Sequence, residues 1–256
     1  MSIQGKAAVV TGSATGIGQG VVLALAQAGV KVAVTYNRDP ASETMRLIKE
    51  AGGEAIVVKT DVRSRESIRN LMEETYKAFG RLDILVNNAA IQPNKLLFDY
   101  TEEEYDSVME VNVKGYWRCI QEALPYLKKA EHGRIINVAS IHAKRPTGFD
   151  AIYGSSKGGI KMITREAALA LGRYGITVNT LSPGSIKIPP RETRHAIEKT
   201  VCVENLEFKN YPQGGFLSGR IGVPRDMGFC IVFLADEQSQ FITGSTLRAD
   251  GGAMMN

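Results

Sequence analysis

The chain has 256 residues, of which 44% are hydrophobic and 23% charged, and its formal net charge is +4. This composition is typical of a soluble globular protein, and the mild basic excess forms no basic run, which argues against nucleic-acid binding. No apolar run is long enough to span a membrane, no signal peptide is evident, and the three cysteines are too widely spaced for a disulfide framework or a zinc site. We therefore expect a cytoplasmic protein without a metal site.

Seven short runs rich in β-branched residues predict strands, and in the first half of the chain longer helical patterns separate them. The runs lie at residues 6–10, 31–36, 54–59, 82–86, 133–140, 176–182 and 245–249. Strands that alternate with helices indicate βαβ units and a parallel sheet covered on both faces. We predict a single doubly wound, Rossmann-type α/β domain over residues 1–256, with a seven-stranded parallel sheet.

Capping residues predict where several helices begin and end. Asp39 is expected to cap a helix whose first residue is Pro40, and Gly52 to follow that helix. Pro125 is expected to end or kink its helix. The other predicted starts are Ser64, the capping box of Thr101 and Glu104, and Pro224, whose helix should run to about Ala235.

One segment interrupts this regular order. Residues 184–222 contain proline, glycine and charged residues but no predicted strand, and we expect them to form a lid over a substrate. The segment carries four basic side chains, Arg191, Arg194, His195 and Lys199. They either contact an acidic substrate or form a solvated helix face, and we favour the solvated face.

The stretch VVTGSATGIGQG follows the first predicted strand and opens a helix. Gly12, Gly16 and Gly18 permit a tight turn and a close approach of the backbone to a phosphate, which the N–H groups of the helix N-terminus would bind. A merely tight turn is the alternative. The flanking strand and helix favour the cofactor site.

TGSATGIG resembles the TGxxxGxG cofactor motif of the classical short-chain dehydrogenases/reductases, and the resemblance extends over nearly the whole chain. It includes NNAA at 87–90, VNV around Asn112, Ser140, the Tyr153-x-x-x-Lys157 pair, SPGSI at 182–186 and RADGGA at 248–253. The resemblance implies a homotetrameric oxidoreductase that transfers a hydride between a nicotinamide cofactor and an alcohol or ketone.

Tyr153 and Lys157 lie four residues apart, so a helix would place both side chains on one face. A nearby ammonium group should lower the pKa of the tyrosine and make it a better general acid–base catalyst. Ser140 could hydrogen-bond the same substrate oxygen. The resemblance implies these roles, adds Asn112 as the holder of a water for a proton relay, and gives Lys157 a second role in binding the nicotinamide ribose. It also places His142 on the substrate side, together with Ser140 and Tyr153.

The resemblance further assigns the cofactor contacts to Gly12, Thr15, Gly16, Ile17, Gly18, Asn37, Arg38, Asp61, Val62, Asn88, Ala89, Tyr153, Lys157, Pro183, Gly184 and Ile186. The chain departs from the family pattern at two positions. Ala90 replaces the more common glycine, which is tolerable if its φ is negative. Ile188 stands where the family often has a threonine that helps to hold the cofactor.

The end of the second predicted strand bears on the choice between NADP and NAD. Tyr36 and Asn37 stand where members that use NAD usually have an acidic residue, and Arg38 follows. A guanidinium group can pair with the ribose phosphate of NADP, so we favour NADP. If the strand ends later, Asp39 could instead face the ribose and favour NAD.

Three functions remain at this stage. The first is a dehydrogenase/reductase for a sugar or polyol, the second is a 3-oxoacyl reductase with the same chemistry, and the third is a non-catalytic dinucleotide-binding sensor. A sensor would not need Asn112, Ser140, Tyr153 and Lys157 together. The expected homotetramer has modest support from apolar residues on the helices at 101–130 and 152–174, although all of them could belong to the core: Val108, Val111, Trp117, Ile160, Met162, Ile163, Ala167 and Leu171.

Overall fold

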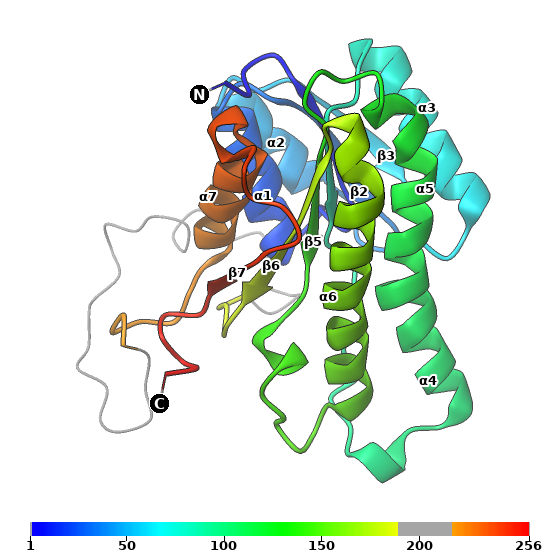
Figure 1. Cartoon of the computed structure of the whole chain (residues 1–256), viewed down its shortest axis with the longest axis vertical. Helices are drawn as coiled ribbons and strands as arrows, with labels where there is room; N and C mark the ends of the chain where they lie inside the picture. The colour runs from blue at the N-terminus through cyan, green and yellow to red at the C-terminus, as the bar shows by residue number, and fades with distance from the viewer. Residues whose placement is uncertain (1, 189–216, 256) are drawn as a thin grey trace.

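The computed structural model describes residues 2–188 and 217–255 and shows one seven-stranded sheet in the order β3-β2-β1-β4-β5-β6-β7 (Figure 1). Every strand pair is parallel. The predicted fold is thus confirmed. The strands are β1 (Ala7–Val10), β2 (Lys31–Tyr36), β3 (Ala55–Lys59), β4 (Ile84–Asn87), β5 (Arg134–Val138), β6 (Thr177–Pro183) and β7 (Thr246–Ala249).

Helices cover both faces of this sheet (Figure 1). The helices are α1 (Gly16–Gln27), α2 (Ser42–Glu50), α3 (Arg65–Phe79), α4 (Glu102–Met109), α5 (Gly115–Leu127), α6 (Ala151–Leu171) and α7 (Pro224–Ala235). One buried cluster joins the sheet to α1 and α7, and a second joins it to α3, α5 and α6. The strand order reverses between β1 and β4, and such a switch point forms a crevice at the carboxyl ends of the strands.

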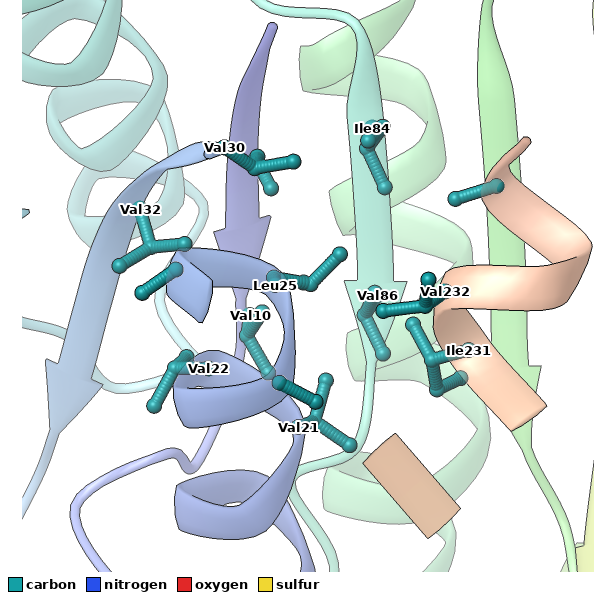
Figure 2. Packing of buried hydrophobic residues seen from close by; sticks show 14 of the residues in the cluster. Val10, Val21, Val22, Leu25, Val30, Val32, Ile84, Val86, Ile231 and Val232 are labelled. Atoms are coloured by element: carbon teal, nitrogen blue, oxygen red, sulfur yellow. The ribbon is translucent and has the colours of Figure 1, made fainter. Parts of the chain in front are cut away.

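Successive side chains of a strand point to opposite faces of the sheet and so contribute to both clusters. In β4, Ile84 and Val86 belong to the cluster on the α1 and α7 face, whereas Leu85 belongs to the opposite cluster. Figure 2 shows Val86 beside Ile231 and Val232 of α7, with Ile84 farther along the same strand. Burial on both faces explains why the central strands read as continuous apolar runs in the sequence.

Most predicted caps are confirmed. The Ser64 side chain accepts a hydrogen bond from the Ser67 amide, and Thr101 and Glu104 form the predicted capping box. The helix α7 runs from Pro224 to Ala235 as predicted. The helix α5 continues through Pro125 and ends two residues later, close to the expected position.

The predicted start of the second helix is wrong. The helix α2 begins at Ser42 with Ala41 as its N-cap, so Asp39 and Pro40 lie outside it. A tertiary contact fixes this start, because the Thr44 hydroxyl donates to the Ala14 carbonyl and accepts from the Gln19 amide. The C-terminal prediction holds, since Gly52 follows the helix with a φ of 73°.

The two described ends of the predicted lid lie together. Ile186 forms a bridge with Gly222, and the Lys187 amide donates to the Gly222 carbonyl at 2.8 Å. The middle of the segment, residues 189–216, lies outside the described residues together with Arg191, Arg194, His195 and Lys199. The lid and the role of these side chains therefore stay predictions.

A search of the described residues finds no helix with the length and hydropathy that a membrane crossing requires. The same part of the chain contains no group of three or more His, Cys, Asp or Glu side chains that could hold a metal ion.

Candidate active site

The glycine-rich turn between β1 and α1 has the backbone that its sequence predicts. Gly12 and Gly16 have φ values of 64° and 61°, in the left-handed region that favours glycine. A Cβ atom at Gly12 would lie 2.9 Å from the Ala89 Cα atom, and one at Gly18 would lie 2.4 Å from the Gly12 carbonyl oxygen. The turn therefore brings α1, whose first turn contains no acidic residue, close to the end of β4.

A groove of about 480 Å³ runs past this turn at the carboxyl ends of β1, β2 and β4. The predicted cofactor residues that line it are Gly12, Thr15, Gly16, Ile17, Asn37, Arg38, Asp61, Val62, Asn88 and Ala89. The first-turn amides of α1 have no partner within the helix, so the groove offers N–H donors and a positive helix end to a diphosphate. These residues fit a dinucleotide cofactor.

The other predicted cofactor residues do not line this groove. Gly18 packs behind the turn, where a Cβ atom would also lie 2.6 Å from the Asn88 Nδ2 atom. Pro183 ends β6, Gly184 packs against the backbone of Asp250, and Ile186 forms the bridge to Gly222. Their contact with a cofactor stays a prediction.

The catalytic candidates meet next to this groove, at the carboxyl end of β5 and the start of α6. Ser140 follows β5 and precedes a short 3₁₀ turn, Ile141–Ala143. Tyr153 and Lys157 lie on successive turns of α6, and the Lys157 Nζ atom is 5.4 Å from the centroid of the Tyr153 ring. The lysine is only 1% exposed, and its Nζ atom donates to the Val138 carbonyl at 2.9 Å.

Asn112 lies in a π-helical turn, Glu110–Lys114, between α4 and α5. Its side chain accepts from the Ile91 amide at 2.9 Å and donates to the Ile91 carbonyl at 3.0 Å. It also donates to the Ser156 hydroxyl at 3.1 Å. Asn112 thus ties the chain after β4 to α6. Its predicted role in holding a water is a separate matter and stays a prediction.

His142 stands beside the tyrosine, with its ring edge-on to the Tyr153 ring at a centroid distance of 5.9 Å. Its Nδ1 atom is buried and has no hydrogen-bond partner among the residues that the structure describes. Burial lowers the pKa of His142, which favours the neutral imidazole. The role of His142 on the substrate side stays a prediction.

Comparisons with known proteins identify the family of this chain. A family model described as Enoyl-(Acyl carrier protein) reductase matches residues 12–254, which is most of the chain. The chain is a short-chain dehydrogenase/reductase. It is 33% identical over 252 residues to the 3-oxoacyl-(acyl-carrier-protein) reductase FabG of Staphylococcus epidermidis, covering 98% of this chain and 99% of the relative. It is 34% identical to an uncharacterized oxidoreductase of Thermotoga maritima, covering 98% of this chain and 96% of that protein.

Solved structures of short-chain dehydrogenases/reductases share the same fold. A dehydrogenase/reductase from Sinorhizobium meliloti superposes with a TM-score of 0.84 at 33% identity, covering 98% of this chain and 96% of that one. A short-chain dehydrogenase/reductase from Serratia marcescens superposes with a TM-score of 0.85 at 30% identity and covers 99% of both chains.

Within this short-chain dehydrogenase/reductase, the expected electrostatic effect of Lys157 on Tyr153 is wrong for this structure. Burial raises the pKa of Tyr153 to about 12, although a hydrogen bond with Ser140 opposes this rise. Burial also lowers the pKa of Lys157 to about 7. The lysine directs its amine to the Val138 carbonyl, and burial, rather than the lysine, dominates the pKa of Tyr153.

Near the end of β2, the groove contains an ion pair that the sequence analysis did not predict. The Arg63 guanidinium grips the Asp61 carboxylate, with the Nη2 and Oδ2 atoms 2.6 Å apart, and holds the pKa of Asp61 below its usual value. Asn37 donates a further hydrogen bond to the same carboxylate. Arg63 also lines the groove and was missed, although its place two residues after Asp61 was an available signal.

The structure also places Asp39, Ala90 and Ile188. Asp39 lines the groove, so its interpretation as a helix cap that points into α2 is wrong. Asn94 is the only described residue other than glycine with a positive φ, so the φ of Ala90 is negative and the departure from glycine is tolerated. Ile188 lines the groove with an apolar side chain, and its Cδ1 atom lies 3.4 Å from the place of a Cβ atom at Gly16.

Proposed function

We propose that this enzyme transfers a hydride between NADP and an alcohol or ketone. The observation that carries the proposal is the grouping of Tyr153, Ser140 and the buried Lys157 beside a groove that fits a dinucleotide. A sensor that only binds a dinucleotide gains nothing from a buried lysine, because desolvation of its amine costs stability. Turnover of NADPH by the purified protein distinguishes an enzyme from a non-catalytic sensor.

The nicotinamide cofactor supplies or accepts the hydride when it is bound. The hydroxyl groups of Ser140 and Tyr153 can both donate to the oxygen of the substrate carbonyl. Tyr153 gives its proton to this oxygen in reduction and takes a proton from the alcohol in oxidation. Lys157, with a pKa of about 7, can hold or release a proton near neutral pH and so can restore the charge state of the tyrosine.

The choice of NADP rests on the charges at the adenosine end of the groove. Asp61 and Arg63 form an ion pair, and Arg38 and Asp39, which follow β2, also line the groove. Arg38 is exposed and lines the groove, where it could pair with a ribose phosphate. Asp39 opposes this preference, so the relative kcat/KM with NADP and NAD decides between them.

Two substrate classes are candidates. The imidazole of His142, whose ring lies edge-on to Tyr153, could hydrogen-bond a substrate with several hydroxyl groups, such as a sugar or polyol. The names of the FabG relatives instead favour a 3-oxoacyl chain. Initial rates with D-glucose, D-gluconate, a polyol and acetoacetyl-coenzyme A, each with both cofactors, distinguish the two classes. A rate limited to the thioester would exclude the first.

We also propose a cytoplasmic homotetramer. Of the apolar residues that the sequence offered as support, Val108 and Ile160 are core residues, whereas Trp117 and Met162 are 43% and 53% exposed. The view that all of them are buried in one subunit is therefore wrong for the last two. Exposed aromatic and methionine side chains are common where subunits meet. Light scattering at micromolar concentration measures the mass directly.

A further inference from the structure

Asp150 occupies the N-cap position of α6 but does not act as a cap. An aspartate at this position usually accepts hydrogen bonds from the amides of the first turn. Here its side chain makes no such bond to the described residues of α6, although it is only 3% exposed. A buried carboxylate that leaves its own helix end unserved must be stabilised by something else.

Its partners come from the segment between β4 and α4, residues 88–100. The Oδ2 atom accepts a hydrogen bond from the Gln92 Nε2 atom, and the Oδ1 atom accepts one from the Tyr100 hydroxyl at 3.2 Å. Bonds to a charged acceptor are stronger than neutral ones. The 88–100 segment is thus held near both of its ends by one carboxylate.

Both the 88–100 segment and Asp150 lie close to the reaction site. Its first residues, Asn88 to Ile91, line the cofactor groove, and Asn112 holds Ile91 from the other side. Asp150 itself lies three residues before Tyr153. Burial is the main cause of the raised pKa of Tyr153, and the negative charge of Asp150 adds to it, whereas at His142 the same charge opposes the lowering of the pKa by burial.

We propose that Asp150 is a positioning residue for the reaction, which holds the 88–100 segment through Gln92 and Tyr100 and places a fixed negative charge beside Tyr153. This inference rests on the proposed function, since it assigns Asp150 a part in the same hydride transfer. The titratable groups that face Tyr153 are Lys157 on α6, His142 on the turn after β5, and Tyr116 on α5.

The first experiment measures the anchor without any need for turnover. Asp150→Ala removes both acceptors, and amide hydrogen exchange over residues 91–100 should become at least about tenfold faster. Asp99→Asn is the matched control, because Asp99 is an exposed carboxylate in the same segment, and its exchange rates should equal those of the wild type. Unchanged exchange in Asp150→Ala would overturn the proposal.

The second experiment separates positioning from simple stabilisation. Asp150→Asn keeps the shape of the side chain and removes its charge, so the pKa of Tyr153 should fall. The pH profile for alcohol oxidation, which requires the deprotonated tyrosine, should move by about half a unit toward lower pH. Gln92→Leu keeps the charge and should raise KM without moving the profile. A profile of Asp150→Asn that coincides with the wild type would overturn the proposal.

The probe for these rates is whichever of D-glucose, D-gluconate, the polyol and acetoacetyl-coenzyme A the wild type turns over fastest. If it turns over none of them, the proposed function fails, and the exchange experiment still decides whether Asp150 anchors the segment. If circular dichroism shows that Asp150→Ala is unfolded, the double variant Gln92→Leu with Tyr100→Phe replaces it. The same increase in exchange is expected, and its absence overturns the proposal.

Discussion

Replacing Lys157 with methionine should abolish most activity and make the protein more stable. The lysine is 1% exposed, and burial lowers its pKa from 10.5 to about 7. Because the unfolded chain binds a proton more tightly at this group, protonation favours unfolding. At pH 6, a difference of about 3.5 pKa units, at ~1.36 kcal/mol each, corresponds to a cost of about 4–5 kcal/mol in the free energy of unfolding.

Part of the stability that the variant gains by losing the buried amine is offset. Methionine fills a volume similar to that of the lysine stem but loses the hydrogen bond to the Val138 carbonyl, which is worth about 1 kcal/mol. The carbonyl stays satisfied, because the Tyr116 hydroxyl also donates to it at 3.2 Å. We therefore expect Lys157→Met to be about 3–4 kcal/mol more stable at pH 6. The sequence alone, by contrast, predicts little change in the thermal stability of this variant.

The sign of the pH dependence identifies the cause. The wild type loses stability as the pH falls from about 10.5 to about 7, and below pH 7 the lysine is protonated in both states. The advantage of the variant should thus shrink to about 1 kcal/mol at pH 9. Urea denaturation at both pH values measures it, with the exposed Lys144→Met as the control. An equal difference at pH 6 and pH 9, or a less stable variant at pH 6, would refute this reasoning.

Other predictions concern the groove. Arg38→Ala should reduce the preference for NADP over NAD by about ten- to hundredfold, since one charge-assisted bond is worth ~1.5–3 kcal/mol, and leave kcat/KM with NAD nearly unchanged. If the wild type prefers NAD, Asp39 has determined the choice instead. Gly18→Ala should lower stability by about 1–3 kcal/mol, measured by denaturation, because the new Cβ atom would overlap the Gly12 carbonyl oxygen at 2.4 Å. Ile188→Thr should tighten NADPH binding in a fluorescence titration, whereas equal affinity would show that this position makes no polar contact with the cofactor.

The sequence predicted the fold well because its signals are local. Central strands such as β4 read as apolar runs, and the capping box at Thr101 is complete within four residues. The start of α2 was missed because the bonds of Thr44 to α1 decide it, and these bonds join residues far apart in the chain. Tertiary contacts of this kind leave no periodic pattern in the sequence.

The same distinction applies to the site. The Tyr-x-x-x-Lys spacing correctly places Tyr153 and Lys157 on one side of α6, but burial sets their pKa values, and burial is a property of the folded chain. Asp150 was not singled out, because an aspartate before a helix is usually only a cap. Its partners Gln92 and Tyr100 lie 58 and 50 residues away.

The most direct test of the central claim is the rate of Tyr153→Phe. This variant removes only the phenolic oxygen and should still bind NADPH, because the groove at the ends of β1, β2 and β4 does not depend on that oxygen. With the best substrate of the panel, we expect kcat to fall by a factor of about 10²–10⁴, the usual contribution of general acid–base catalysis. A variant that binds NADPH and retains kcat within about threefold of the wild type would contradict the assignment of Tyr153 as the group that moves the proton.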